Sequence, residues 1–244
     1  MSRCVLILGA TSDIAQALAY EFAGHGYSLI LAARRPSRLV PLVSDLRIRH
    51  NVEVKAVAFE ALDYAGHAAF YDRLEPKPDV AICVFGYLGR QEAGQVDFEE
   101  AARLIQINYT GAVSILNLIA NDFEQRRSGT VIGLSSVAGD RGRQSNYLYG
   151  SAKAGLTAYL SGLRNRLFKA NVRVITVRPG FVRTRMTAGL NLLGPLTATP
   201  QQAAKAIFKA FRRNRDNVYV LPVWRYIMLI IRCLPEFIFK RLNL

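Results

Sequence analysis

The sequence of 244 residues predicts a single-domain α/β fold built on a parallel sheet, and three observations support this. First, the chain suits one domain with a large core, because 51% of its residues are hydrophobic and 20% charged, a balance that excludes a disordered chain. Second, short apolar runs alternate with longer segments of helical periodicity. Third, this alternation is repeated six times, which implies strand–helix–strand crossovers and a Rossmann-type, doubly wound sheet of seven strands.

Seven short runs are expected to form strands, because most of them are apolar on both faces, as in parallel strands covered by helices. They are Cys4–Gly9, Ser28–Ala33, Val52–Phe59, Val80–Phe85, Thr130–Leu134, Val172–Val177 and Val218–Leu221. Helices are expected near residues 13–24, 38–49, 65–74, 97–126, 149–170 and 200–213. We expect residues 1–222 to form the main domain, with a long mobile insertion at 181–199, and residues 223–244 to form a tail of the same domain.

The charge of the chain favours an acidic partner. Lysine and arginine number 32 against 18 acidic residues, a formal net charge of +14, which suits nucleic acid, anionic lipid or a phosphorylated substrate. The three cysteines and three histidines show no ligand spacing, so we expect neither a metal site nor a disulfide framework. No apolar stretch reaches the roughly 18 residues of a membrane span, and we expect a cytoplasmic protein.

The turn after the first strand is a candidate site for a diphosphate. A tight turn between a strand and a helix presents backbone N–H groups and a helix N-terminus to a phosphate. The residues of this turn are Gly9, Thr11, Ser12, Asp13 and Ile14, with Asp13 as the expected N-cap. Asp13 and Ala15 replace the second and third glycines of the dinucleotide fingerprint, so an ordinary capped helix stays an alternative.

Two arginines, Arg34 and Arg35, follow the second expected strand, where an acidic residue would bind the ribose 2′-hydroxyl of NAD. A guanidinium at this point suits the 2′-phosphate of NADP. We therefore expect NADP(H) to be preferred and leave NAD(H) open as a second cofactor. The alternative is that both arginines are solvated loop residues.

A candidate catalytic group follows the fifth strand. Tyr149 and Lys153 are four residues apart at the start of an expected helix and therefore share one face. An ammonium beside a phenol lowers the pKa of the phenol, which makes Tyr149 a candidate general acid–base. Ser136, thirteen residues earlier, could donate a hydrogen bond to a substrate carbonyl. Tyr147 competes for the tyrosine role, but its spacing to Lys153 places the two on different parts of the helix.

These residues resemble the short-chain dehydrogenase/reductase family. Four motifs match in order and spacing, namely IQINYTG, SSVAG, YGSAK and RPGFVRT. The resemblance implies an enzyme in which Tyr149 transfers a proton and Ser136 orients the carbonyl. It also implies that Lys153 lowers the pKa of Tyr149 and holds the nicotinamide ribose, and that Asn108 anchors a water in a proton relay.

The resemblance also implies how the cofactor is bound. Tyr149 and Lys153 of YGSAK would lie against it, and so would residues of RPGFVRT, with Pro179 and Gly180 around the nicotinamide, Thr184 near the diphosphate, and Val182 also in contact with the cofactor. The run Val84-Phe85-Gly86-Tyr87 departs from the family pattern after the fourth strand, which puts its contacts to the adenosine side in doubt. Gly86 is the residue of this run that we expect to touch the cofactor.

Further stretches, among them DVAICVFGYLG and GDRGRQSNYLYGSAKAGL, are similar to one branch of the family, the decaprenylphosphoryl 2-keto-pentose reductases. That resemblance implies reduction of a 2-keto sugar on a polyprenyl phosphate for cell-wall polysaccharide, beside a partner oxidase. It also implies a homodimer or homotetramer. The alternatives are a reductase of a small soluble ketone and, more remotely, a non-catalytic nucleic-acid- or cofactor-binding protein. Against nucleic acid, the chain lacks a recognition helix and aromatic–basic interleaving.

Four arginines are candidates for binding a substrate phosphate. Arg141 and Arg143 lie between Ser136 and Tyr149, and Arg183 and Arg185 follow Gly180, so both pairs are expected at the carboxyl edge of the sheet. Guanidinium groups there suit a phosphate. The alternative for each is a solvated surface arginine.

The end of the chain is basic and amphipathic. Residues 205–244 hold nine lysines or arginines and two acids, and the segment VWRYIMLIIRCLPEFIF is largely apolar. Such a segment suits the headgroup region of an anionic membrane. The alternative is that it packs on its own domain or on a second subunit.

Overall fold

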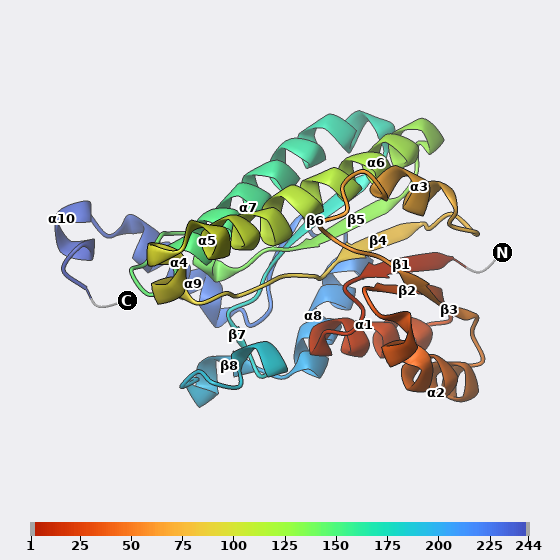
Figure 1. Cartoon of the computed structure of the whole chain (residues 1–244), viewed down its shortest axis with the longest axis horizontal. Coiled ribbons are helices and arrows are strands. Elements are labelled where there is room, and N and C mark those ends of the chain that lie inside the picture. The colour runs from red at the N-terminus through yellow and green to blue at the C-terminus, as the bar shows by residue number, and fades with distance from the viewer. Residues whose placement is uncertain (1–2, 243–244) are drawn as a thin grey trace.

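The structure is a computed structural model and describes residues 3–242. Its centre is a parallel sheet of seven strands in the order β3-β2-β1-β4-β5-β6-β9 (Figure 1). This confirms the predicted fold class. The strands are β1 (Cys4–Leu8), β2 (Ser28–Ala33), β3 (Val54–Ala58), β4 (Val80–Cys83), β5 (Thr130–Leu134), β6 (Arg173–Arg178) and β9 (Asn217–Tyr219).

The central strand β1 supplies apolar side chains to both faces of the sheet. Val5 and Ile7 point into one buried cluster, while Cys4, Leu6 and Leu8 point into the other, as the two-residue period of a strand requires. β1 pairs with β2 on one side and β4 on the other. The strand order reverses between β1 and β4, and a doubly wound sheet binds ligands outside the strand ends at such a point.

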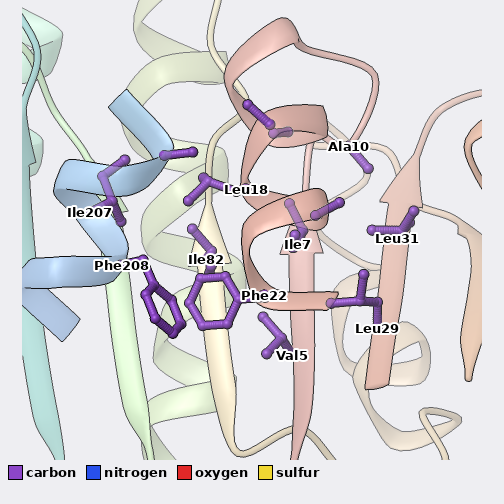
Figure 2. Packing of buried hydrophobic residues seen from close by; sticks show 14 of the residues in the cluster. Val5, Ile7, Ala10, Leu18, Phe22, Leu29, Leu31, Ile82, Ile207 and Phe208 are labelled. Atoms are coloured by element: carbon purple, nitrogen blue, oxygen red, sulfur yellow. The ribbon is translucent and has the colours of Figure 1, made fainter. Parts of the chain in front are cut away.

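Helices cover each face in one layer. One layer holds α1 (Asp13–Ala23), α2 (Val40–His50) and α8 (Pro200–Arg212), and the other holds α3 (His67–Asp72), α6 (Gly111–Arg126) and α7 (Tyr147–Leu167). Figure 2 shows Phe22 of α1 beside Phe208 of α8, over the strands. Their ring centroids are 5.0 Å apart in an edge-to-face arrangement, the geometry that aromatic pairs prefer.

The single helix expected at 97–126 is interrupted. α4 (Gln91–Val96) precedes it, and Asp97 ends α4 in an extended conformation and caps α5 (Phe98–Ile105) by accepting a hydrogen bond from the Glu99 N–H at 2.9 Å. A π-helical turn at Gln106–Thr110 then separates α5 from α6. Such turns are frequent at functional sites, and this one contains Asn108.

Two segments after β6 lie outside the main sheet and its helix layers. The expected insertion at 181–199 contains β7 (Phe181–Val182) and β8 (Thr197–Ala198), which pair in a separate two-stranded sheet. The tail forms α9 (Val223–Cys233) and α10 (Glu236–Phe239), and Figure 1 shows α10 at one extreme of the molecule. Among residues 3–242, no helix has the length and apolar character that crossing a membrane requires. Residues 1–2 of the predicted main domain and residues 243–244 of the predicted tail lie outside the described residues.

Candidate active site

A cleft with a volume of about 510 Å³ opens at the carboxyl ends of the strands. Parallel strands bring their carboxyl ends to one edge of the sheet, so residues far apart in the sequence meet there. From the predicted site, the cleft is lined by Gly9, Thr11, Ser12, Asp13, Ile14, Arg34, Gly86, Ser136, Tyr149, Lys153, Pro179, Gly180, Val182, Thr184 and Arg185. The cleft therefore lies where the strand order reverses, between β1 and β4, as the topology predicts.

Gly9 brings the ends of β1 and β4 close together. Its φ is +88°, and a Cβ at this position would lie 2.6 Å from the backbone N of Phe85. A side chain at Gly9 would therefore force the two strand ends apart and distort the first turn.

The first turn is capped differently from our prediction. Ser12 rather than Asp13 is the N-cap of α1, and its hydroxyl accepts a hydrogen bond from the Ala15 N–H at 3.2 Å. The Asp13 carboxylate instead accepts hydrogen bonds from the backbone N–H of Arg185 at 2.7 Å and from its Nε at 2.9 Å. The guanidinium of Arg185 also donates to the carbonyl oxygen of Thr11. Arg185 thus joins the first turn to the segment after β7.

Of the two arginines predicted to recognise NADP, Arg34 lines the cleft and Arg35 does not. Arg38, which the sequence reasoning missed, lines it as well. The chain enters a 3₁₀ turn at Pro36–Leu39, so Arg34 and Arg38 come to the same wall while Arg35 lies exposed outside the cleft. The sequence did contain a signal for Arg38: it follows Arg34 by four residues, with Pro36 between them to start a turn.

The serine, tyrosine and lysine predicted to catalyse lie together in the cleft. Ser136 follows β5 and caps a short 3₁₀ turn by accepting a hydrogen bond from the Ala138 N–H at 3.1 Å. α7 begins at Tyr147, two residues before Tyr149, so Tyr149 and Lys153 lie one turn apart on it. The Lys153 Nζ lies 5.7 Å from the centre of the Tyr149 ring.

Burial raises the pKa of Tyr149 and lowers that of Lys153, so the expectation of a lowered pKa for Tyr149 is wrong. Protein atoms around the Tyr149 hydroxyl raise its pKa to about 12, and a hydrogen bond from Ser136 only partly opposes this. Burial lowers the pKa of Lys153 to about 8. The Lys153 Nζ donates to the carbonyl oxygen of Leu134 at 3.0 Å, rather than to the phenol. Burial, rather than the charge of the Lys153 ammonium, therefore sets the pKa of Tyr149.

Asn108 is buried behind the cleft and does not line it. Its Oδ1 accepts a hydrogen bond from the Tyr87 N–H at 3.1 Å, and its Nδ2 donates to the carbonyl oxygens of Tyr87 at 2.6 Å and Leu104 at 2.9 Å. A Cβ at Gly86 would lie 2.9 Å from the Asn108 Oδ1 and 3.5 Å from the Lys153 Nζ. Gly86 thus separates Asn108 from Lys153, and its missing side chain lets both approach the loop.

Three of the four arginines predicted to bind a phosphate do not line the cleft. Arg141 donates to carbonyl oxygens of the tail, at 2.6 Å to Ile231, and forms a salt bridge with Glu236. The Arg143 guanidinium is largely buried, which lowers its pKa, and Arg183 is exposed outside the cleft. Only Arg185 lines the cleft, where it is bound to Asp13. The expected position in the cleft is wrong for Arg141, Arg143 and Arg183, because position in the sequence gives the edge of the sheet but not the direction of a long side chain.

The sequence reasoning missed several residues of the cleft, among them Phe85, Tyr87, Arg103 and Met186. The Arg103 guanidinium lies 5.1 Å from the centre of the Tyr87 ring, in cation–π contact. Arg103 lies on α5, and no motif in the sequence marked it as a residue of the cleft. Within residues 3–242, no three histidine, cysteine or acidic side chains come close enough together to hold a metal ion.

Comparison with known proteins decides the family. A model of the short chain dehydrogenase family matches residues 3–192, most of the chain. The chain belongs to this family. An uncharacterized oxidoreductase of Mycobacterium tuberculosis is 35% identical over 241 residues, which cover 98% of this chain and 96% of that protein. An uncharacterized oxidoreductase of Streptomyces coelicolor is 37% identical over 242 residues, which cover 98% and 96%.

A solved structure shares the arrangement of nearly all of this chain. The short-chain dehydrogenase of Sphingobium yanoikuyae in complex with NADPH has a TM-score of 0.83 and 25% identity, and the match covers 96% of this chain and 97% of that one. As a member of the short-chain dehydrogenase family, the protein is therefore an NAD(P)-dependent oxidoreductase. Its own residues fit a nicotinamide dinucleotide, because one cleft joins the close approach at Gly9, the arginine wall and the Ser136–Tyr149–Lys153 group.

Proposed function

We propose that this protein reduces a ketone with NADPH as the hydride donor. One observation carries the proposal: a single cleft holds Ser136, Tyr149 and Lys153 together with Arg34 and Arg38. The first three side chains offer a proton donor and hydrogen-bond donors for a carbonyl oxygen. The two guanidiniums offer charge to the 2′-phosphate that distinguishes NADPH from NADH.

The proton for the new alcohol comes from Tyr149. Its pKa of about 12 keeps the phenol protonated at neutral pH, so the group is ready to donate. Reduced nicotinamide, when bound in the cleft, would provide the hydride for the carbonyl carbon. The carbonyl oxygen then takes the phenolic proton, and the Ser136 hydroxyl beside Tyr149 holds that oxygen by a hydrogen bond.

The charge of Lys153 stabilises the phenolate that remains. Its pKa of about 8 means that most of the lysine is protonated at pH 7. The ammonium lies 5.7 Å from the ring of Tyr149, in surroundings from which water is largely excluded, so its attraction for a phenolate is only weakly screened. Loss of the phenolic proton in turn favours the charged form of Lys153.

The preference for NADPH is supported by the segment after β2. It holds three arginines, Arg34, Arg35 and Arg38, and no carboxylate. Two of the three line the cleft, and the acidic residue that lines the cleft near them, Glu60, follows β3 rather than β2. The position at which a carboxylate would bind the ribose of NADH therefore carries positive charge.

For the substrate we propose a 2-keto sugar carried on a polyprenyl phosphate, formed by a partner oxidase and used for cell-wall polysaccharide. Two observations support it: the motif resemblance described above and the net charge of +14. The arginine positions do not add support, because Arg141, Arg143 and Arg183 lie outside the cleft. A homodimer or homotetramer is proposed on the family resemblance alone.

The test is a substrate comparison that follows the absorbance of the reduced cofactor. The purified protein is assayed with a polyprenyl-phosphate 2-keto pentose, with the same keto sugar lacking the lipid and phosphate, and with small soluble ketones, each with NADPH and with NADH. We expect the highest kcat/KM with the lipid phosphate and NADPH. Equal kcat/KM values for the lipid-free sugar would remove the lipid from the proposal, and no oxidation with any ketone would remove the reductase function itself.

A further inference from the structure

The inner face of α9 is part of the core of the domain. Trp224 and Met228 are buried and form a cluster with Val137, the residue after Ser136. The indole Nε1 of Trp224 donates to the carbonyl oxygen of Leu196 at 3.0 Å. The alternative that the tail packs on its own domain is therefore correct for this face of the helix, and deleting the tail would expose a buried cluster.

The outer face of α9 is apolar and exposed. Tyr226, Leu229 and Ile230 lie on the side opposite Trp224 and Met228, and their exposed fractions are 64%, 59% and 65%. α10 adds two further exposed apolar side chains, Phe237 and Ile238, which are exposed by 61% and 40%. We call these five residues the tail surface. A helix that is apolar on both faces is normally buried on both. The inner face of α9 packs on the domain, so the tail surface is expected to bind a further partner.

Positive charge surrounds the tail surface. Arg225 and Arg232 lie on one flank of α9, since they are seven residues apart, and Lys240 and Arg241 follow α10. In the part of the chain that the structure describes, none of these four cations has a carboxylate within salt-bridge distance. The one acid of residues 223–242, Glu236, forms its salt bridge with Arg141 at 2.8 Å.

Arg141 fixes the angle between the two tail helices. Its guanidinium donates to the carbonyl oxygens of Ile231 and Leu234, both at 2.6 Å, and so caps the end of α9. It also lies 3.7 Å from the centre of the Phe239 ring, which holds α10. Arg141 belongs to the loop between Ser136 and Tyr149, so the tail surface is fixed to the wall of the active site.

We propose that the tail surface binds an anionic lipid membrane, with its apolar side chains in the headgroup region and the four cations against lipid phosphates. Apolar side chains flanked by unpaired cations are the pattern of helices that lie in a membrane interface. A second copy of the chain fits less well, because a symmetric contact would bring the four cations of both copies into one interface with no carboxylate of the tail free to pair with them. The proposal is independent of the substrate, and it brings the cleft to a surface where lipid-borne ketones are found.

The experiment is flotation of the full-length protein with vesicles of phosphatidylcholine alone or with one third phosphatidylglycerol. We expect binding to the anionic vesicles at low salt and loss of binding at high salt, because salt screens the cations. The double variant Leu229→Asp/Ile230→Asp should lose binding. The double variant Arg225→Gln/Arg232→Gln should partition about 30-fold more weakly, the factor expected for two cations near the surface.

The matched control is Ile48→Asp in α2, a side chain that is 83% exposed far from the tail. It should bind vesicles like the unchanged protein. Circular dichroism and turnover of a soluble ketone check that each variant is folded. Two results would overturn the proposal: no binding of the unchanged protein to anionic vesicles at low salt, or equal loss in the Ile48 variant. A change of the oligomer mass in the Leu229→Asp/Ile230→Asp variant, without vesicle binding by the unchanged protein, would assign the face to a second copy instead.

Discussion

The side-chain amide of Asn108 pairs with the backbone of Tyr87 in both directions, accepting from its N–H at 3.1 Å and donating to its carbonyl oxygen at 2.6 Å. The pair joins the π-helical turn before α6 to the loop after β4. These hydrogen bonds and the one to the carbonyl oxygen of Leu104 hold the shape of the cleft wall that includes Gly86 and Tyr87.

Replacing Asn108 by Ala should therefore destabilise the fold as well as slow the reaction. The change leaves backbone groups of Tyr87 and Leu104 without partners in a buried place, at a cost of about 2 kcal/mol in the free energy of unfolding. Chemical denaturation measures this value. Asn117→Ala on α6 is the control, because its amide oxygen only accepts from the Tyr159 hydroxyl at the surface and its loss should cost about 0.5 kcal/mol or less. Equal losses in the two variants would contradict the role given to Asn108.

Replacing Tyr149 by Phe should remove the proton donor and keep the ring. A positioned general acid contributes about 10²–10⁴-fold, so kcat for ketone reduction should fall by at least 100-fold. Binding of NADPH, followed by fluorescence titration, should change little. Tyr147→Phe is the control, because Tyr147 is an exposed residue outside the cleft. Full activity of Tyr149→Phe, with loss in Tyr147→Phe, would exchange the two assignments.

The buried Lys153 should make stability depend on pH. Its pKa is lowered from the ordinary 10.5 to about 8, so below pH 8 the folded protein bears the full cost of a buried charge. Between about pH 8 and 10.5 the unfolded chain keeps the proton that the folded chain has lost, and stability rises with pH. The unchanged protein should thus gain about 2–3 kcal/mol relative to Lys153→Met between pH 7.5 and 10.

The comparison with Lys153→Met removes the effects of the other titrating groups, which both proteins share. Urea denaturation in the absence of cofactor, at several pH values, gives the two curves. Parallel curves would mean that Lys153 has an ordinary pKa in the folded protein.

The sequence was sufficient for the features that local spacing decides. Tyr149 and Lys153 share a helix face because they are four residues apart, and Ser136 meets them because parallel strands end at one edge. The seven expected strands are those of the main sheet and differ from them mainly at their ends, because short apolar runs mark buried parallel strands, whereas the short pair β7 and β8 was not expected. The π-helical turn at Asn108 gave no such signal, since its residues also suit an ordinary helix.

Contacts between distant segments could not be read from the sequence. Asp13 and Arg185 are 172 positions apart, and nothing in either segment indicates that they meet. Arg141 was expected in the cleft, but it binds the tail, because the free carbonyl groups at the end of α9 attract a guanidinium on the neighbouring loop. The pKa of Tyr149 was expected to fall, because its spacing to Lys153 was known and its burial was not.

Arg34 and Arg38 should distinguish NADPH from NADH. A charge-assisted hydrogen bond contributes about 1.5–3 kcal/mol, so replacing either arginine by Ala should raise the Kd of NADPH by roughly 10- to 150-fold and leave that of NADH nearly unchanged. Isothermal titration measures both constants. Arg35→Ala is the matched control, since Arg35 lies in the same segment and outside the cleft. A loss of affinity for NADH of the same size would show that the arginines do not recognise the 2′-phosphate.

Gly180 should be coupled to Trp224, which ties the cofactor loop to the tail. A Cβ at Gly180 would lie 2.0 Å from the indole of Trp224, so Gly180→Ala must displace the indole or the loop. Overpacking of this kind costs about 1–3 kcal/mol, and we expect that loss in the free energy of unfolding together with weaker NADPH binding.

Trp224→Leu alone should also destabilise the fold, because it removes a buried ring from the cluster with Met228. The double variant should be more stable than the sum of the two losses predicts, since the smaller side chain makes room for the methyl group. Strictly additive losses would contradict the contact between Gly180 and the Trp224 indole.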